Sequence, residues 1–342
     1  MRIGMPLPYS GSFVETVDQL PDYRAAGLSI VYVAEAYSFD AVSQLGFIAA
    51  KVPDLEIASN ILPIYTRTPS LLAMTAAGLD HVSGGRFTLG LGASGPQVIE
   101  GFHGVAYDAP IGRTREIIEI CRQVWRREKL EHAGKHYRMP REGGLGKPLK
   151  LINHPVRERI PILIAAMGPK NVELAAEVAE GWAPFFFRPE GYQDVWGSAL
   201  TAGTARRDPA LPALDVVVPV PVAIGEATEA LRDHARPQFA LYIGGMGAKG
   251  KNFYHDLATR YGYGEQADRI QELYLAGHKD EAAAAVPAEL LRDVALVGPR
   301  SWVAERLAAM HEAGVTTLSI TPFDRTHAER VKTIETLADL LP

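Results

Sequence analysis

Short apolar segments alternate along this chain with longer segments whose apolar residues follow helical spacing. Residues 28–34 (LSIVYVA) and 160–166 (IPILIAA) carry no charge and are rich in β-branched side chains. Such runs are typical of strands buried on both faces, as in a parallel sheet. Thr68 and Pro69 then suit the start of a helix, with an N-cap hydroxyl followed by proline at the first helical position.

Applied to the whole chain, the same criteria predict eight strands and the helices between them. The strands are expected at 2–7, 28–34, 55–61, 86–91, 160–166, 182–187, 214–224 and 315–320. Helices are expected at 13–26, 39–51, 69–82, 111–128, 169–181, 299–313 and 326–340, a loop at 130–156, and helices without a convincing strand at 226–296.

Eight strands that alternate with helices predict an α/β fold, a closed (β/α)₈ TIM barrel. We interpret residues 1–342 as one such domain, with a helical insertion at about 226–296. A doubly wound sheet is the alternative. It would be expected to carry a GxGxxG phosphate loop after its first strand, and the segment MPLPYSGSF there lacks that pattern.

Composition and charge narrow the function classes. The 35 basic and 40 acidic residues give a formal charge of 35 − 40 = −5, which argues against a nucleic-acid partner. The single cysteine, Cys121, excludes an intrachain disulfide and a cysteine-based metal cluster, and the ten histidines show no metal-ligand spacing, so no metal is expected. Neither a membrane span nor a signal peptide is visible, so we expect a cytoplasmic enzyme.

Candidate site residues follow from the barrel, because active sites of this fold lie where the strands end. These positions are Pro8, Tyr9, Ser10, Glu35, Ala36, Tyr37, Asn60, Ile61, Leu62, Gly92, Ala93, Ser94, Met167, Gly168, Pro169, Arg188, Gly225, Glu226, Thr321 and Pro322.

Glu35 stands out, since it ends a strongly apolar strand. A carboxylate there can act as an acid/base or hydrogen-bond a cofactor. The alternative is that Glu35 pairs with a basic residue at the barrel rim, and that nearby Asp40 caps the next helix.

Two glycine-containing segments could approach a ligand closely. Residues 90–96 (GLGASGP) leave the fourth strand, and Gly168-Pro169-Lys170 opens a helix whose free N–H groups could bind an anion. A tight turn and an ordinary helix start explain these two segments equally well.

His103 could face the same site or serve as a loop hydrogen-bonding residue. Ser94 does not match the G-x-S-x-G nucleophile motif, so a serine hydrolase is not favoured.

Together these motifs resemble the luciferase-like monooxygenase superfamily, in particular its F420-dependent oxidoreductase branch. The resemblance rests on four segments, which are VAEAYSFDAVSQLGFIAA, the segment from ASNILPIYTRTPS to SGGRFTLGLGASG, PIGRTREIIEICRQVW and AAMGPKNVELAAEVAEGW. The segments GGMGAKGKNFYHDLATRYGYG and VALVGPRSWVAERLAAMHEAGVTTLSITPF resemble the F420 branch. The similarity covers nearly the whole chain and implies a barrel that is usually dimeric.

The resemblance also implies site residues. A cis peptide at Asn60–Ile61, after Ser59, would back the cofactor ring, and the ring loop would be Gly92, Ala93, Ser94 and Gly95. Met167, Gly168, Pro169 and Lys170 would hold the cofactor phosphate. Glu35 would be the main acid/base candidate, with Tyr37 and His103 as lesser ones. The His and Trp that mark sugar-phosphate dehydrogenases of this family are not evident after the second strand, so a sugar phosphate is not expected as substrate.

The expected function is therefore transfer of a hydride between coenzyme F420 and a small organic molecule. An FMN-dependent monooxygenase and a cofactor-binding protein without turnover are the alternatives. F420 is favoured over FMN because its tail carries several carboxylates that suit basic residues. Lys249, Lys251 and Arg188 are candidates to bind that tail, with Arg260 nearby. We expect a homodimer.

Overall fold

The protein is described here from a computed structural model, which covers residues 1–9, 11–226, 228–247 and 249–342. Ser10, one of the strand-end candidates, lies outside the described residues, as do Ala227 and Ala248.

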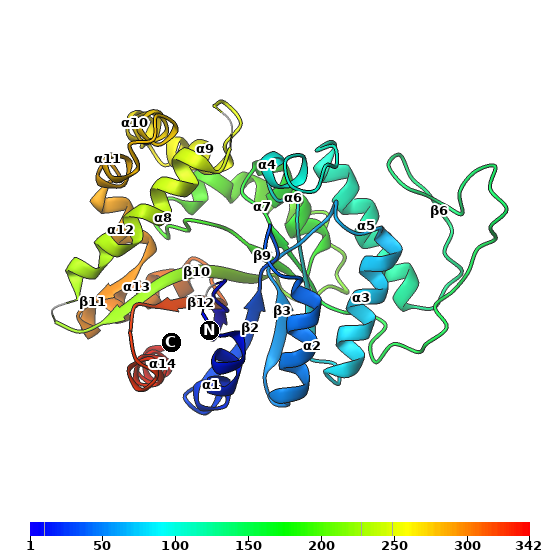
Figure 1. Cartoon of the computed structure of the whole chain (residues 1–342), viewed down its shortest axis with the longest axis horizontal. Coiled ribbons are helices and arrows are strands. Elements are labelled where there is room, and N and C mark those ends of the chain that lie inside the picture. The colour runs from blue at the N-terminus through cyan, green and yellow to red at the C-terminus, as the bar shows by residue number, and fades with distance from the viewer. Residues whose placement is uncertain (10, 227, 248) are drawn as a thin grey trace.

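Among the described residues, eight parallel strands close into a barrel surrounded by helices (Figure 1). Around the ring, each strand pairs with the next and the last pairs with the first, which confirms the TIM barrel and rules out the open sheet. In ring order these strands are β1 (Arg2–Pro6), β2 (Leu28–Val33), β3 (Glu56–Ser59), β5 (Phe87–Gly92), β8 (Ile162–Ala165), β9 (Gly181–Ala183), β10 (Asp215–Ile224) and β12 (Thr317–Pro322).

The helices that cover the barrel agree with the predicted ones to within a few residues. They are α1 (Phe13–Ala25), α2 (Ala41–Lys51), α3 (Pro69–Val82), α5 (Pro110–Trp125), α6 (Pro169–Val178), α13 (Arg300–Glu312) and α14 (His327–Leu340). Their caps follow the sequence signals. The Thr68 hydroxyl accepts a hydrogen bond from the Leu71 N–H, and the Asp40 carboxylate accepts one from Ser43, so Asp40 is indeed a helix cap.

Two strand predictions need correction. Strand β9 ends at Ala183 rather than at residue 187, so residues 184–188 form a loop at the end of the barrel. A short strand that the sequence did not reveal, β11 (Leu296–Gly298), pairs with the last residues of β10. Three residues are too few to show strand periodicity, which explains why this strand escaped prediction.

The core has two parts. The barrel interior is filled by side chains from alternate positions of the strands, namely Ile30, Tyr32, Ala58, Leu163, Ala183 and Val217. A larger apolar layer lies between the strands and the surrounding helices. Because the interior is packed, a ligand can only be held at an end of the barrel.

The described residues between β10 and β11 fold mainly into helices, as predicted, and these helices pack on one another beside the barrel (upper left in Figure 1). They comprise η2 (Glu229–Ala235), α8 (Arg236–Ala240), η3 (Leu241–Gly245), α9 (Phe253–Arg260), α10 (Gly264–Leu275), α11 (Lys279–Ala284) and α12 (Ala288–Val294). The remaining short elements are β4 (Leu62–Pro63), α4 (Pro96–Ile99), η1 (Gln193–Gly197) and α7 (Ser198–Thr204).

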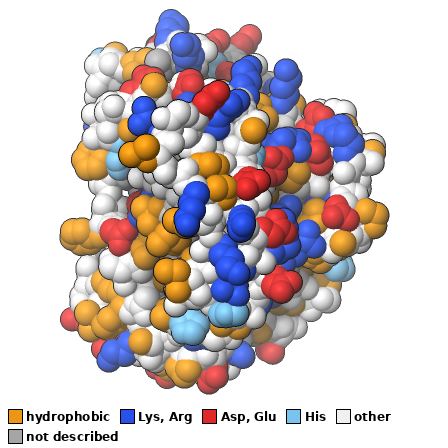
Figure 2. Space-filling model, turned by 90° about the vertical axis from the view of Figure 1, so that its right-hand side faces the viewer, with side chains coloured by type: hydrophobic (Ala, Val, Ile, Leu, Met, Phe, Trp, Pro, Cys, Tyr) orange, Lys and Arg blue, Asp and Glu red, His pale blue; other side chains and the backbone are white. Residues whose placement is uncertain are grey.

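The predicted loop 130–156 is an arm that extends away from the barrel on the side of α5 (Figure 1). It contains one short antiparallel pair, β6 (His132–Ala133) with β7 (Arg138–Met139). The face that carries this arm mixes apolar side chains with charges of both signs (Figure 2). The arm is fastened to α5 by Glu116, whose carboxylate accepts hydrogen bonds from the backbone N–H groups of Lys135, His136 and Tyr137.

We expect Glu116→Gln to destabilise the protein by about 1–3 kcal/mol at neutral pH, because a buried carboxylate loses charge-assisted hydrogen bonds. Burial opposes ionisation of Glu116, but the N–H donors of Tyr137 and His136 and the His132 ring hold its pKa below the ordinary value of 4.5. This stabilisation is therefore complete above pH 4.5 and is lost as the pH falls through the lower folded pKa. Urea unfolding of both proteins should show their difference shrinking below that pH, and a pH-independent difference would contradict this role.

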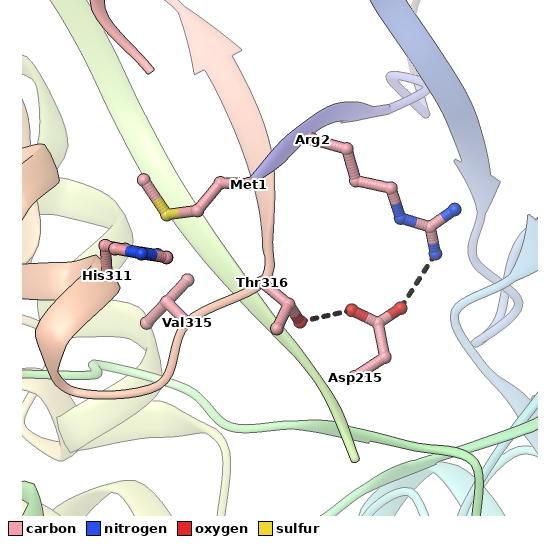
Figure 3. Close-up of a pocket in the computed structure, with 6 residues that line it drawn as sticks. All are labelled: Met1, Arg2, Asp215, His311, Val315 and Thr316. Carbon is pink, nitrogen blue, oxygen red and sulfur yellow. Dashed lines mark hydrogen bonds and ion pairs between the residues drawn. The ribbon is translucent and has the colours of Figure 1, made fainter. Parts of the chain in front are cut away.

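The amino ends of the strands hold a pocket of about 310 Å³ (Figure 3). Its floor is an ion-pair network in which Arg2 contacts Asp215 and Glu56, with nitrogen–oxygen distances of 2.7 Å for each pair. Thr316 donates a hydrogen bond to the Asp215 carboxylate, and Met1, His311 and Val315 line the other side (Figure 3). Charges that are already paired at this end of a barrel indicate a role in stability rather than in chemistry.

Candidate functional site

The carboxyl ends of the strands meet at the opposite end of the barrel, which we call the mouth. The ends of β2, β3 and β5 are joined there by backbone hydrogen bonds. The Asn60 N–H donates to the Val33 carbonyl at 2.9 Å, and the Glu35 N–H donates to the Ile61 carbonyl at 3.2 Å. Strand β4 then pairs with β5, so residues 59–63 form a fixed wall of the mouth.

This wall contains the cis peptide Asn60–Ile61, as the sequence predicts. Gly90 is what allows the close approach of β3 and β5. A Cβ atom on Gly90 would lie far closer to the Ser59 carbonyl oxygen than van der Waals contact allows. The Ser59 hydroxyl is fully buried, accepting from the Gly90 N–H and donating to the Gly90 carbonyl. Its side chain therefore holds the two strands together.

Glu35 forms a nearly buried ion pair with Arg67, a residue that the sequence did not single out. Its Oε2 atom accepts from Arg67 Nη2 at 2.9 Å and from the Ala41 N–H at 3.0 Å. The exposed fractions of the Glu35 and Arg67 side chains are 9% and 13%. Arg67 also contacts Asp40 at 2.8 Å. Of the two roles considered for Glu35, the structure therefore shows the ion pair with a basic residue at the barrel rim.

The RTP segment that begins α3 was the available signal for Arg67, because it places a cation at the start of a helix beside the strand ends. Hydrogen bonding to Glu35 is the main cause that raises the pKa of Arg67 above its ordinary value. Arg67 is therefore permanently charged, and its position beside the Asn60–Ile61 wall fixes the acidic side chain within the mouth.

His103 and Tyr37 lie together near the same strand ends. The His103 ring lies 3.3 Å from the carbonyl oxygen of Ala36, so the loop after β2 and the segment after α4 are in contact. The ring centroid of Phe102 lies 6.2 Å from that of Tyr37 and 5.1 Å from that of His103. One ring nitrogen of His103 thus meets a backbone carbonyl, which agrees with the alternative of a loop hydrogen-bonding residue.

The glycine loop after β5 is shaped to approach its neighbours closely. A Cβ on Gly92 would lie 3.0 Å from the side chain of Ile61, and Ser94 adopts a positive φ of 57°. A Cβ on Gly95 would lie 3.7 Å from the Met246 carbonyl oxygen. Gly92, Ala93, Ser94 and Gly95 therefore lie between the cis-peptide wall and the end of η3.

The helix start at Gly168 has features of an anion site. Gly168 is the N-cap of α6, makes no side-chain capping bond, and has open space where a Cβ would stand. Lys170 in the first turn is exposed. The Met167 carbonyl accepts hydrogen bonds from Trp196 Nε1 at 2.7 Å and from Arg260 Nη2 at 2.9 Å, so the loop before the helix is held firmly.

The basic residues proposed for the cofactor tail behave differently from one another. Arg188 forms an ion pair with Asp293 at 2.6 Å and stacks near Tyr261, so its charge is already neutralised. Arg260 donates a hydrogen bond to the Met167 carbonyl, so its role is structural. Lys249 and Lys251 are exposed and remain available to a tail.

The mouth also carries tyrosines that the sequence did not assign to a site. Tyr9 was named only as a strand-end position, and Tyr242 and Tyr254 belong to the helical insertion. The rings of Tyr242 and Tyr254 lie 4.6 Å apart, a contact that no spacing rule of the sequence reveals.

Within the described ranges, no cluster of three His, Cys, Asp or Glu side chains is arranged to hold a metal ion. In the same part of the chain, no helix has the length and apolar character needed to cross a membrane.

Comparison with known proteins gives one family and several relatives. The model of the family described as luciferase-like monooxygenase matches residues 1–317. Rv3520c of Mycobacterium tuberculosis, whose name proposes a coenzyme F420-dependent oxidoreductase, is 40% identical over 336 residues, covering 94% of this chain and 95% of that protein. The 5,10-methylenetetrahydromethanopterin reductase of Archaeoglobus fulgidus is 25% identical, covering 85% and 84% of the two chains.

Solved structures confirm the fold. The coenzyme F420-dependent tetrahydromethanopterin reductase of Methanopyrus kandleri superposes with a TM-score of 0.82 at 19% identity, over 99% of this chain and 98% of that one. An F420-dependent secondary alcohol dehydrogenase, solved with an F420–acetone adduct, gives a TM-score of 0.78 at 15% identity, over 100% and 99%. At these identities the likeness concerns the architecture.

Proposed function

Because this chain belongs to the luciferase-like monooxygenase family, we propose that it is an oxidoreductase that uses coenzyme F420 to transfer a hydride to or from a small organic substrate. The observation that carries the proposal is the 40% identity with an F420-dependent oxidoreductase over nearly the full length of both chains. When bound, the deazaflavin supplies the C5 carbon that carries the hydride.

The residues at the mouth fit such a cofactor. A flat ring needs a close, rigid backbone on one side, which Asn60–Ile61 and Gly92 supply, since a Cβ at Gly92 would crowd Ile61. A phosphate needs free N–H groups, and the start of α6 at Gly168 offers them beside the exposed Lys170. Both features lie at the carboxyl ends of the strands.

In this proposal, side chains of the protein itself orient the groups that would contact the substrate. The Arg67–Glu35 pair fixes the loop after β2, and with it Tyr37 and the carbonyl of Ala36 that contacts His103. Tyr37 and His103 are the groups able to hold or move a proton near the substrate, since neither is locked in an ion pair. In this proposal Glu35 positions these groups and does not itself exchange protons.

The exposed lysines should bind the acidic tail of the cofactor. We expect the double variant Lys249→Ala/Lys251→Ala to bind F420 up to about 30-fold more weakly, since exposed charges contribute about 1 kcal/mol or less each. Added salt should weaken F420 binding to the parent protein more than to the variant. Fluorescence titration measures both. Lys147→Ala/Lys150→Ala, on the exposed arm, is the matched control, and equal effects of the two pairs would contradict a tail site.

Turnover tests the proposed reaction. Reduced F420 is mixed anaerobically with the protein and a panel of ketones and enones, and the visible absorbance of oxidised deazaflavin is followed. The proposal expects re-oxidation that depends on one class of acceptor and on the protein. Tight binding of F420 without re-oxidation by any acceptor would favour a binding protein without turnover.

We also propose that the protein acts as a homodimer, as the family resemblance implies. Analytical ultracentrifugation should show twice the mass of the 37.1 kDa chain, and a single monomeric species would contradict this proposal.

A further inference from the structure

The arm at residues 130–156 carries large apolar side chains that its own chain leaves exposed. Leu145, Ile152 and Leu149 are 108%, 88% and 70% exposed, and Val156 at the base of the arm is 51% exposed. Single exposed apolar residues are ordinary on a protein surface. Several of them on one projecting element indicate an interaction site.

The arm is held in shape within the single chain. The Leu130 N–H donates a hydrogen bond to the Leu149 carbonyl at 2.8 Å, and Arg127 Nε donates one to the Leu151 carbonyl at 3.2 Å. The hydrogen bonds accepted by Glu116 hold the arm at a further point. Its apolar side chains are therefore presented by a preorganised element, which lowers the entropy cost of binding a partner.

Helix α3 presents a second apolar surface on the same side of the barrel (Figure 1). Leu71, Met74 and Val82 follow helical spacing along its outer face and are 46%, 53% and 60% exposed. The helix contains no lysine, arginine or glutamate, and its one aspartate, Asp80, is buried. Because a helix face that meets only water normally carries charges, this face indicates a surface that another molecule covers.

The two apolar surfaces meet at the base of the arm. A Cβ on Gly85, in the turn after α3, would lie 3.5 Å from the side chain of Val156. The next residue, Arg157, forms an ion pair with Asp80 of α3 and donates a hydrogen bond to the Phe87 carbonyl at 2.6 Å. We call the combined apolar surface the arm face, and it consists of Leu71, Met74, Val82, Leu145, Leu149, Ile152 and Val156.

We propose that the arm face binds a second copy of this chain, with the arm of each copy lying on α3 of the other. This contact presupposes the homodimer of the proposed function and names its surface. A projecting arm and an apolar helix face on one side of a molecule complement each other when two copies meet about a two-fold axis. A standard interface takes about 20–30 residues from each side, which the arm and the outer face of α3 together supply.

Charge favours the same partner. Residues 130–156 include five basic and two acidic residues, a net charge of 5 − 2 = +3, which leaves −5 − 3 = −8 on the rest of the chain. The basic arm is therefore attracted to the acidic body of another copy. An anionic membrane would also attract the arm, but a flat surface that touched its tip could not cover α3, because the arm projects beyond that helix (Figure 1).

Sedimentation velocity of the full chain tests this surface. The variant Leu145→Lys/Ile152→Lys changes two side chains that are almost fully exposed in the single chain, so its circular dichroism should match the parent's. Its dimer dissociation constant should rise at least about 100-fold, since both side chains lose their burial in the dimer. Leu71→Glu/Met74→Glu should have the same effect. Leu275→Lys, at an exposed position of α10, is the matched control and should dimerise as the parent does.

A mixture of the two double variants tests the contact itself. Their mixed dimer keeps one native contact, between the arm of the α3 variant and α3 of the arm variant, and in the other contact new lysines face new glutamates. Dimers should therefore form in the mixture at concentrations where neither variant forms them alone. Double variants that dimerise as tightly as the parent, or a mixture that stays monomeric, would overturn the arm contact.

The same samples separate this contact from the other proposals. A monomeric parent, including one that binds phosphatidylglycerol vesicles, would overturn the arm contact and the homodimer together. A parent that binds F420 and whose double variants stay dimeric removes the arm contact alone. A parent that dimerises through the arm without binding F420 keeps the arm contact and removes the proposed cofactor.

Discussion

Replacing Gly90 by alanine should destabilise the protein by about 3 kcal/mol and abolish cofactor binding. The added methyl group has no room, because it would overlap the Ser59 carbonyl oxygen, and backbone cannot swing away as a flexible side chain can. Strands β3 and β5 would have to separate, which would break the paired hydrogen bonds of Ser59 with Gly90 and displace the Asn60–Ile61 wall. Urea unfolding and F420 titration measure the two effects.

Gly78→Ala provides the control for this prediction. Gly78 lies inside helix α3, and nothing lies within 4 Å of the position that its added methyl group would take, so the same chemical change meets no obstacle there. Alanine in an open helical position should stabilise by about 0.5–1 kcal/mol. If Gly90→Ala proved as harmless as Gly78→Ala, the close contact between β3 and β5 would not shape the mouth.

Removing the cation from the Arg67–Glu35 pair should also destabilise the protein strongly. Arg67→Met leaves the Glu35 carboxylate, 9% exposed, with the Ala41 N–H as its remaining partner at 3.0 Å. Breaking one side of a buried pair typically costs about 3–5 kcal/mol, because the other charge stays buried without compensation. Chemical unfolding of the variant measures this loss.

Two further variants make this prediction specific. Glu35→Gln in the Arg67→Met background removes the stranded charge, so the double variant should regain most of the lost stability. Arg126→Met breaks the pair with Glu128, in which both side chains are nearly half exposed, and should cost about 1 kcal/mol or less. Equal losses for Arg67→Met and Arg126→Met would show that the Glu35 pair behaves as a surface contact.

The barrel could be predicted from the sequence because its strands are strongly apolar and its helices carry clear caps. Residues 28–34 and 160–166 have no charge, and Thr68 and Asp40 cap helices as their side chains suggest. Strand β11 could not be predicted, because three residues, 296–298, are too few to show the alternation of a strand and they lie next to a helix start.

Two features near the candidate site were expected on different grounds. The cis peptide at Asn60–Ile61 was implied by the family resemblance and the helix start at Gly168 by its Gly-Pro sequence, and both are present. The partners of charged residues are not local. Arg67 lies 32 positions from Glu35, and Asp293 lies 105 positions from Arg188, so the sequence alone could not show that these charges neutralise one another.

The choice of cofactor is the central claim, and a parallel titration with F420 and FMN tests it most directly. Tryptophan emission is a suitable signal, because Trp196 donates a hydrogen bond to the Met167 carbonyl directly before the helix start at Gly168. We predict saturable quenching at lower concentrations of F420 than of FMN, and weaker F420 binding at higher salt. Tighter binding of FMN than of F420, with an affinity for F420 that salt does not change, would contradict it.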